Sequence, residues 1–124
     1  MIGAIIGDIA GSRFEFDNHR SKDFVMFHEK CKVTDDTIMT LAVAKAIMET
    51  KKELGSLFKI EDLGMKRLSE QAVRFMQEIG RKYPDCGYGG MFGNWVFNPH
   101  PEPYCSFGNG AAMRVIRRRD LRDT

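Results

Sequence analysis

The residues of this chain with the clearest chemical potential are Thr34-Asp35-Asp36-Thr37, in which two adjacent carboxylates lie between two hydroxyls. A nearly unbroken apolar run, residues 38–48, follows and predicts a helix with Thr34 as its N-cap. Asp35 and Asp36 would then occupy the first turn, where the helix dipole favours negative charge. Two neighbouring carboxylates are also hard oxygen ligands that suit Mg²⁺, Ca²⁺ or Mn²⁺. The spacing alone leaves both interpretations open, a capped helix start and a divalent-cation site.

Two further acidic residues, Asp8 and Glu15, lie near the amino terminus. Isoleucines at helical spacing predict a helix over residues 2–12, and glycines recur every fourth residue on a neighbouring stripe. We interpret Asp8 as a hydrogen-bonded structural residue, because a buried carboxylate is kept only when it is paired. If the helix extended to Glu15, the two carboxylates would line one cleft. Taken alone, a glutamate such as Glu15 is more often a solvated side chain.

Residues 84–110 are rich in proline, glycine and aromatic side chains. We expect a long loop without regular structure, which is uncommon in a compact domain unless it is functional. It ends in Ser106-Phe107-Gly108-Asn109-Gly110, directly before a short helical pattern. Free amides at such a glycine-lined helix start can hold a phosphate, although the Lys-Ser/Thr of a P-loop is missing. This glycine pattern is weak evidence by itself.

Two long helices must position these residues. The helix that Thr34 opens is apolar on nearly every side and should lie inside a bundle, ending in the polar stretch 49–55. The second, over residues 60–80, is amphipathic, with Gly80 as its predicted stop. Its predicted buried stripe is Met65, Leu68, Ala72, Phe75, Met76 and Ile79.

The first of these helices needs more neighbours than so short a chain can easily supply. We therefore expect exposed apolar faces that promote self-association. The residues concerned are Ile38, Leu41, Val43 and Ile47.

The composition, with 43% apolar and 29% charged residues among 124, is that of one ordinary soluble domain. A net charge of +2 gives no global field that would attract nucleic acid. The three cysteines lack metal-site spacing and are interpreted as reduced thiols. The apolar amino terminus is broken by Asp8, has no basic segment before it, and no apolar stretch is long enough to span a bilayer. These features predict a cytoplasmic protein with no membrane partner.

Four stretches read together resemble the ADP-ribosylglycohydrolase family, whose members remove ADP-ribose from modified proteins and related acceptors. They are GAIIGDIAGSRFEF at residues 3–16, TDDT at 34–37, GYGGMFGNW at 87–95 and FGNGAAMR at 107–114. Each is weak singly, but four in the family's order are specific. The resemblance implies an all-α helical bundle, of which residues 1–124 would be the amino-terminal half.

The resemblance also implies a site with two Mg²⁺ ions, or Mn²⁺, in a central cleft. Thr34, Asp35 and Asp36 would be metal ligands, with Asp36 also serving catalysis. Glu15 would be a catalytic residue that reaches the metal or gates the cleft beside the ribose. The residues expected to hold the diphosphate and ribose are Gly87, Gly89, Gly90, Ser106, Gly108, Asn109 and Gly110. The implied reaction is hydrolysis of the N- or O-glycosidic bond of ADP-ribosylated protein or a small ADP-ribosyl compound.

The chain departs from the family pattern in two places. It contains no Asp-x-Asp, so half of the implied metal ligands are absent. The match gives way to a basic stretch at residues 116–124, which we interpret as a divergent tail. We favour the out-of-frame end of an interrupted gene over a solvated helix end or a basic contact patch.

The sequence therefore predicts a truncated, impaired Mg²⁺-dependent ADP-ribosyl hydrolase. A non-catalytic module that binds ADP-ribose or a related nucleotide is the alternative. A third reading, a nucleic-acid-binding fragment using the basic residues at 117–119, is not expected, and steep weakening by salt would reveal it.

Overall fold

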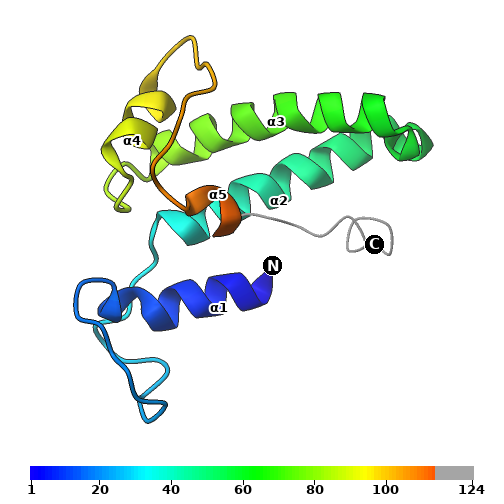
Figure 1. The fold of residues 1–124 in the computed structure, drawn as a ribbon. Helices are drawn as coiled ribbons and strands as arrows, with labels where there is room; N and C mark the ends of the chain where they lie inside the picture. Colours follow the sequence, from blue (N-terminus) through cyan, green and yellow to red (C-terminus); the bar gives the residue numbers. More distant parts are fainter. Residues whose placement is uncertain (114–124) are drawn as a thin grey trace.

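In the computed structural model, which describes residues 1–113, helices are joined by loops and no strand occurs in that range (Figure 1). This confirms the all-α prediction. The predicted basic tail at 116–124 lies outside the described residues. The α-helices are α1 (Ile2–Gly11), α2 (Asp35–Leu54), α3 (Glu61–Lys82), α4 (Gly90–Phe97) and α5 (Gly110–Met113), with short 3-10 helices η1 (Ser12–Phe14) and η2 (Gly55–Lys59).

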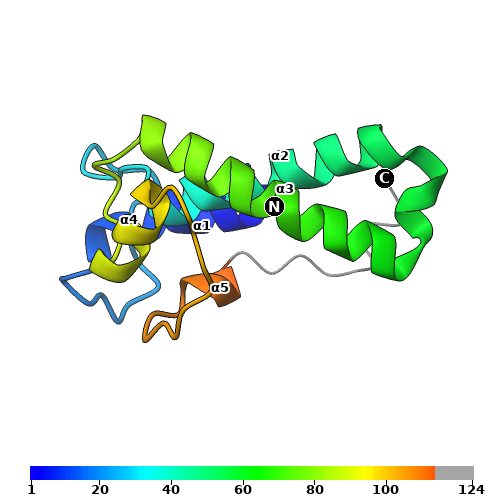
Figure 2. The ribbon, with the colours of Figure 1, turned by 90° about the horizontal axis from the view of Figure 1, so that it is seen from above.

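The helices α2 and α3 form an antiparallel pair, joined through η2, that makes most of the interior (Figures 1 and 2). Its core is Ala42, Ala46 and Phe75, which are buried because small residues on α2 admit the aromatic ring of α3. Most of the predicted stripe of α3 packs against this core, namely Leu68, Ala72, Met76 and Ile79. Met65 does not: its side chain is 56% exposed. It lies near the beginning of α3, and periodicity does not tell where along a helix the stripe meets its partner.

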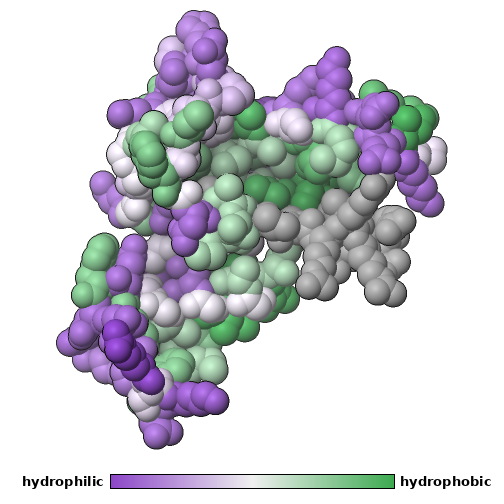
Figure 3. Space-filling view, viewed as in Figure 1, coloured by the Kyte–Doolittle hydropathy of each residue, from purple (hydrophilic) through white to green (hydrophobic). Residues whose placement is uncertain are grey.

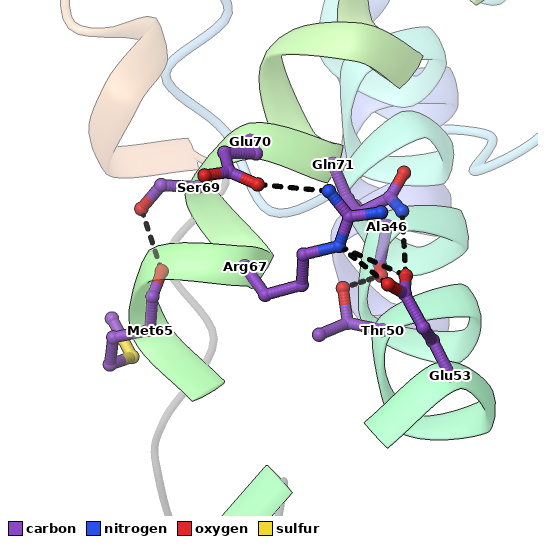
Figure 4. Close-up of polar contacts among 8 residues, drawn as sticks. All are labelled: Ala46, Thr50, Glu53, Met65, Arg67, Ser69, Glu70 and Gln71. Carbon is purple, nitrogen blue, oxygen red and sulfur yellow. Dashed lines mark hydrogen bonds and ion pairs between the residues drawn. The ribbon is translucent and has the colours of Figure 1, made fainter. Parts of the chain in front are cut away.

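A polar network also joins α2 to α3 (Figure 4). Arg67 donates from Nε to both oxygens of Glu53, at 2.9 and 3.0 Å, and from Nη1 to Glu70 at 2.9 Å. Gln71 donates to Glu53 at 3.1 Å. The hydrogen bond from Arg67 is the largest cause that lowers the pKa of Glu53, and desolvation opposes it. Gln71 is buried, but the side chains of Arg67, Glu53 and Glu70 are partly exposed, so their ion pairs contribute little to stability.

Within the expected long loop, residues 90–97 form the helix α4, so that part of the prediction is wrong. Side chains of α3 hold α4 by its carboxyl end. Gln77 donates to the carbonyls of Trp95 and Asn98, at 2.9 and 2.8 Å. Arg81 donates to the carbonyl of Val96 at 2.9 Å. The carbonyl of Trp95 also accepts from the amide of Asn98 at 3.2 Å. The side-chain bonds from α3 add donors at the carboxyl end of α4, which stabilises a short helix of low intrinsic propensity.

Gly80 lies where α3 packs closely against α4. A Cβ at this position would lie 2.9 Å from Cγ1 of Val96 and 3.3 Å from Cε of Met39. Gly80 was predicted to stop the helix, but α3 continues to Lys82. The glycine is needed for packing, and helix termination is left to the residues after it.

The helix α1 leaves much of its apolar surface uncovered. Ile2 is 75% exposed and Ile6 is 40% exposed, and apolar surface is visible over α1 and over the α2–α3 pair (Figure 3). On α2, Ile38 and Ile47 are buried whereas Leu41 is 46% exposed, so the predicted exposed face is only partly present. No helix within residues 1–113 is long and apolar enough to cross a membrane.

Candidate functional site

The first turn of α2 begins as the sequence predicts. Thr34 has an extended backbone conformation and its Oγ1 accepts a hydrogen bond from the amide of Asp36 at 3.3 Å, so it is the N-cap. Its side chain is buried, at 8% exposed. Asp35 and Asp36 follow in the first turn and are half-buried. The cap interpretation is confirmed, and two carboxylates with partial access to solvent remain beside it.

Asp8 of α1 binds this turn through hydrogen bonds to its carboxylate. Its Oδ1 accepts from Thr34 Oγ1 at 2.5 Å, and its Oδ2 accepts from the amides of Thr34 and Thr37, each at 3.2 Å. The hydroxyl of Thr37 donates to the same Oδ2 at 2.5 Å. The structural, hydrogen-bonded role predicted for Asp8 is therefore confirmed. Four donations to one carboxylate fix α1 against the start of α2.

The segment that leads into α4 meets the same turn. The amide of Asp35 donates to the carbonyl of Cys86 at 2.8 Å. Burial raises the pKa of Cys86, and the carboxylates of Asp35, Asp85 and Asp8 raise it further. The raised pKa favours the protonated thiol, which is a weaker nucleophile than the thiolate.

The predicted binding loop follows directly. Gly87 has φ of +92°, a left-handed conformation that side chains disfavour. A Cβ added at Gly87, Gly89 or Gly90 would meet nothing within 4 Å. The backbone of this loop is thus open on the side where a side chain would be. The loop keeps its position through the Cys86 carbonyl and through Tyr88, whose hydroxyl donates to the Gly80 carbonyl at 3.4 Å.

The second predicted binding segment, the turn of Ser106, Gly108, Asn109 and Gly110, leads into α5. Ser106 Oγ accepts from the amide of Gly108 at 3.1 Å, which closes a local turn. Residues 106–109 are exposed. Because α5 contacts α2, this turn lies on the same side of the molecule as the α2 start (Figure 1). The structure therefore brings two predicted binding segments and the predicted metal ligands into one region.

Glu15 is the predicted site residue in the amino-terminal part of the chain. It follows η1 and its side chain is exposed. Ser12, at the beginning of η1, accepts from the amide of Lys32 at 2.9 Å and so ties this part of the chain to the residues just before Thr34. An aromatic cluster of Phe14, His19 and Phe24 shapes the following loop. Both interpretations of Glu15, a solvated side chain and a cleft residue, agree with this exposure.

The sequence analysis did not predict two contacts of the site, the pairing of Thr37 with Asp8 and the bond from Asp35 to the carbonyl of Cys86. The pairing of Thr37 with Asp8 could have been suspected from the second hydroxyl of the Thr-Asp-Asp-Thr motif. The hydrogen bond from the Asp35 amide to the Cys86 carbonyl could not be predicted from residue types, since any residue has a backbone carbonyl.

No group of three or more His, Cys, Asp or Glu side chains that could hold a metal occurs within residues 1–113. The donor set at the start of α2 is smaller: one hydroxyl and two carboxylates. It is nevertheless of the type that Mg²⁺ uses, because this ion keeps several waters and takes one or two carboxylates from the protein. The chemistry of these donors therefore fits a partial Mg²⁺ or Mn²⁺ site.

This chain belongs to the ADP-ribosylglycohydrolase family, whose sequence model matches residues 1–117. Among curated proteins it is similar to ADP-ribosylhydrolase ARH3 of Xenopus tropicalis, with 32% identity over 142 aligned residues. That alignment covers 94% of this chain and 36% of the relative, so the chain spans little more than a third of the relative's length, less than the half expected. No solved structure matches the chain.

Proposed function

We propose that this chain supplies part of the active site of a Mg²⁺-dependent ADP-ribosyl hydrolase. The substrate would be ADP-ribosylated protein or a small ADP-ribosyl compound, cleaved at its N- or O-glycosidic bond. The first turn of α2 carries the proposal, since Thr34, Asp35 and Asp36 place three hard oxygen donors on one turn that Asp8 holds in place. The relative's name, an ADP-ribosylhydrolase, supports the reaction class.

Thr34, Asp35 and Asp36 would hold one Mg²⁺ or Mn²⁺. The second ion that the resemblance implies would need carboxylates beyond those in this chain, which has no Asp-x-Asp. When bound, the metal would polarise the ribose hydroxyls and favour ionisation of a bound water.

The remaining chemistry falls to side chains and loops of this chain. Asp36, or Glu15 from the edge of the cleft, would accept a proton from the attacking water as general base. The water oxygen then bonds to the anomeric carbon, the bond to the acceptor breaks, and the proton that the carboxylate accepted passes to the departing nitrogen or oxygen. Backbone amides of residues 87–90, where the glycines leave space beside the chain, and of the turn at 106–110 would hold the diphosphate.

Metal binding tests the first part of this proposal. Mn²⁺ titrated into the 124-residue chain, followed by electron paramagnetic resonance, should bind weakly and competitively with Mg²⁺. The double variant Asp35→Ala/Asp36→Ala should lose this binding. The matched control is Glu61→Ala/Asp62→Ala, which removes the acidic pair from the first turn of α3 and should leave the affinity unchanged. Equal binding by wild type and the Asp35/Asp36 variant would remove the motif from the proposal.

The second candidate is a module that binds ADP-ribose without hydrolysing it. The open loop at residues 87–90 and the lack of an Asp-x-Asp in the chain favour it. Calorimetry with ADP-ribose distinguishes the two. Binding that is equally strong in Mg²⁺ and in EDTA would support the binding module, whereas binding that needs Mg²⁺ supports the hydrolase site.

A further inference from the structure

The two oxygens of Asp8 have different partners. Oδ2 receives three donors, the amides of Thr34 and Thr37 and the hydroxyl of Thr37. Oδ1 receives the hydroxyl of Thr34, at 2.5 Å. The first three contacts attach α1 to α2, whereas the fourth determines where the hydroxyl proton of Thr34 points.

That proton position matters for a hydroxyl that is also a metal ligand. A threonine oxygen has one proton and two lone pairs. In Thr34 the proton goes to Asp8, and one lone pair accepts from the amide of Asp36 at 3.3 Å. One lone pair is left, and no proton competes with a cation for that direction.

We infer that Asp8 is a positioning residue for the metal site: it turns the Thr34 hydroxyl so that its oxygen, not its proton, is presented to the cation. This inference rests on the proposed function, since it assigns Asp8 a task only if Thr34 is a ligand. Asp8 acts through Thr34 without contacting the metal. The carboxylate also polarises the hydroxyl it accepts from, which makes the oxygen a better donor to a cation.

Asp8→Asn selectively tests the orientation of the Thr34 hydroxyl, because the asparagine amide can fit between its partners in only one way. Two backbone N–H groups point at the Oδ2 position, so the carbonyl oxygen of asparagine has to lie there. The amide nitrogen then occupies the Oδ1 position and donates to Thr34 Oγ1. The hydroxyl loses its acceptor, its proton turns elsewhere, and a lone pair is consumed. Three of the four contacts survive, and only the orientation of the Thr34 hydroxyl is reversed.

The experiment measures Mn²⁺ affinity by electron paramagnetic resonance on the 124-residue chain. Asp8→Asn is expected to weaken binding about tenfold or more, the range typical when a group that orients a metal ligand is changed. Ser12→Ala is the matched control for stability. It removes hydrogen bonds of Ser12 to Ile9 and Lys32 in the same part of the chain without touching Thr34, and should leave Mn²⁺ affinity unchanged.

A double-mutant cycle decides whether Asp8 acts through Thr34. Thr34→Val removes the hydroxyl while keeping the side-chain shape. Adding Asp8→Asn in this background should cause no further loss of affinity. If the two losses are instead additive, or if Asp8→Asn alone binds Mn²⁺ as wild type does, the inference is overturned and the proposed metal motif is unaffected.

A metal-free measurement separates the inference from the proposed function. Proton NMR should show a slowly exchanging Thr34 hydroxyl proton in wild type and in Ser12→Ala, because this buried proton is held by a carboxylate. The signal should be absent in Asp8→Asn. Its absence in wild type would overturn the inference alone. If the signal is present but wild type binds no Mn²⁺ at millimolar concentration, the proposed metal site fails and the positioning role fails with it.

Discussion

Replacing Gly80 by alanine should disturb the packing on which the predicted binding loop depends. Gly80 touches α4 through Val96, and its carbonyl accepts from Tyr88 in the loop. A methyl group here would be 2.9 Å from Val96 Cγ1 and 3.3 Å from Cγ2, both too close for carbon atoms. Val96 is completely buried, so it has no solvent-filled space into which to move.

The expected change in the free energy of unfolding of Gly80→Ala is the sum of two opposing effects. Forcing an extra methyl group into a packed contact costs about 1–3 kcal/mol. Alanine in a helix interior gains about 1 kcal/mol over glycine. The free energy of unfolding should therefore fall by about 0–2 kcal/mol in Gly80→Ala. At Gly7 on α1 a Cβ meets nothing within 4 Å, so Gly7→Ala should raise it by up to about 1 kcal/mol.

Urea unfolding followed by circular dichroism measures both variants. The useful quantity is the difference between them, expected at about 1–3 kcal/mol, because helix propensity is common to both. Gly64→Ala should lower the free energy of unfolding most among the three variants. Its Cβ would be 2.5 Å from the carbonyl oxygen of Phe58, a backbone atom that cannot turn away. If Gly80→Ala is as stabilising as Gly7→Ala, α4 does not rest on α3 as described. Amide shifts at residues 87–90 should move in Gly80→Ala alone.

Three further predictions concern charge, catalysis and association. Because Arg67 lowers the pKa of Glu53, their pairing stabilises the protein above the ordinary glutamate pKa of 4.5 and is lost as pH falls through the lowered value. Urea unfolding at several pH values should show that Arg67→Gln flattens that part of the stability–pH profile. In wild type, high salt should reduce the same pH dependence. The 124-residue chain should hydrolyse ADP-ribosylated protein slowly or not at all, since a complete metal site supplies several kcal/mol; release of ADP-ribose matching an intact family member would contradict this. The exposed side chains of Ile2, Ile6 and Leu41 should cause self-association and ANS binding, which a monodisperse monomer in light scattering would exclude.

Local chemistry made part of the site predictable. The N-cap role of Thr34 follows from a hydroxyl before an apolar run, and a lone charge in an apolar segment indicated that Asp8 has hydrogen-bond partners. The sequence did not indicate which residues those partners are. Thr34 and Thr37 lie 26 and 29 residues away from Asp8, and nothing in their local sequence specifies that pairing.

The helix α4 was missed for a related reason. Gly90 and Gly93 lower the helix propensity of this segment, and the surrounding prolines and glycines favour a loop. The helix forms because Gln77 and Arg81 from α3 bind its last carbonyls and Val96 is buried beside Gly80. Tertiary contacts therefore override the local preference, and single-sequence patterns contain no measure of such contacts.

The amides at the start of α2 decide which ligand chemistry this turn can offer. A helix N-terminus normally has free N–H groups that attract anions. Here the amides of residues 35–37 all have acceptors in the protein: the carbonyl of Cys86, the hydroxyl of Thr34 and the carboxylate of Asp8. The turn is thus poorly suited to phosphate, and its carboxylates favour a cation. A diphosphate in the same region would have to find its donors elsewhere. We propose the backbone at residues 87–90 for this role, since it is tied to this turn through Cys86 and its glycines have free space beside them.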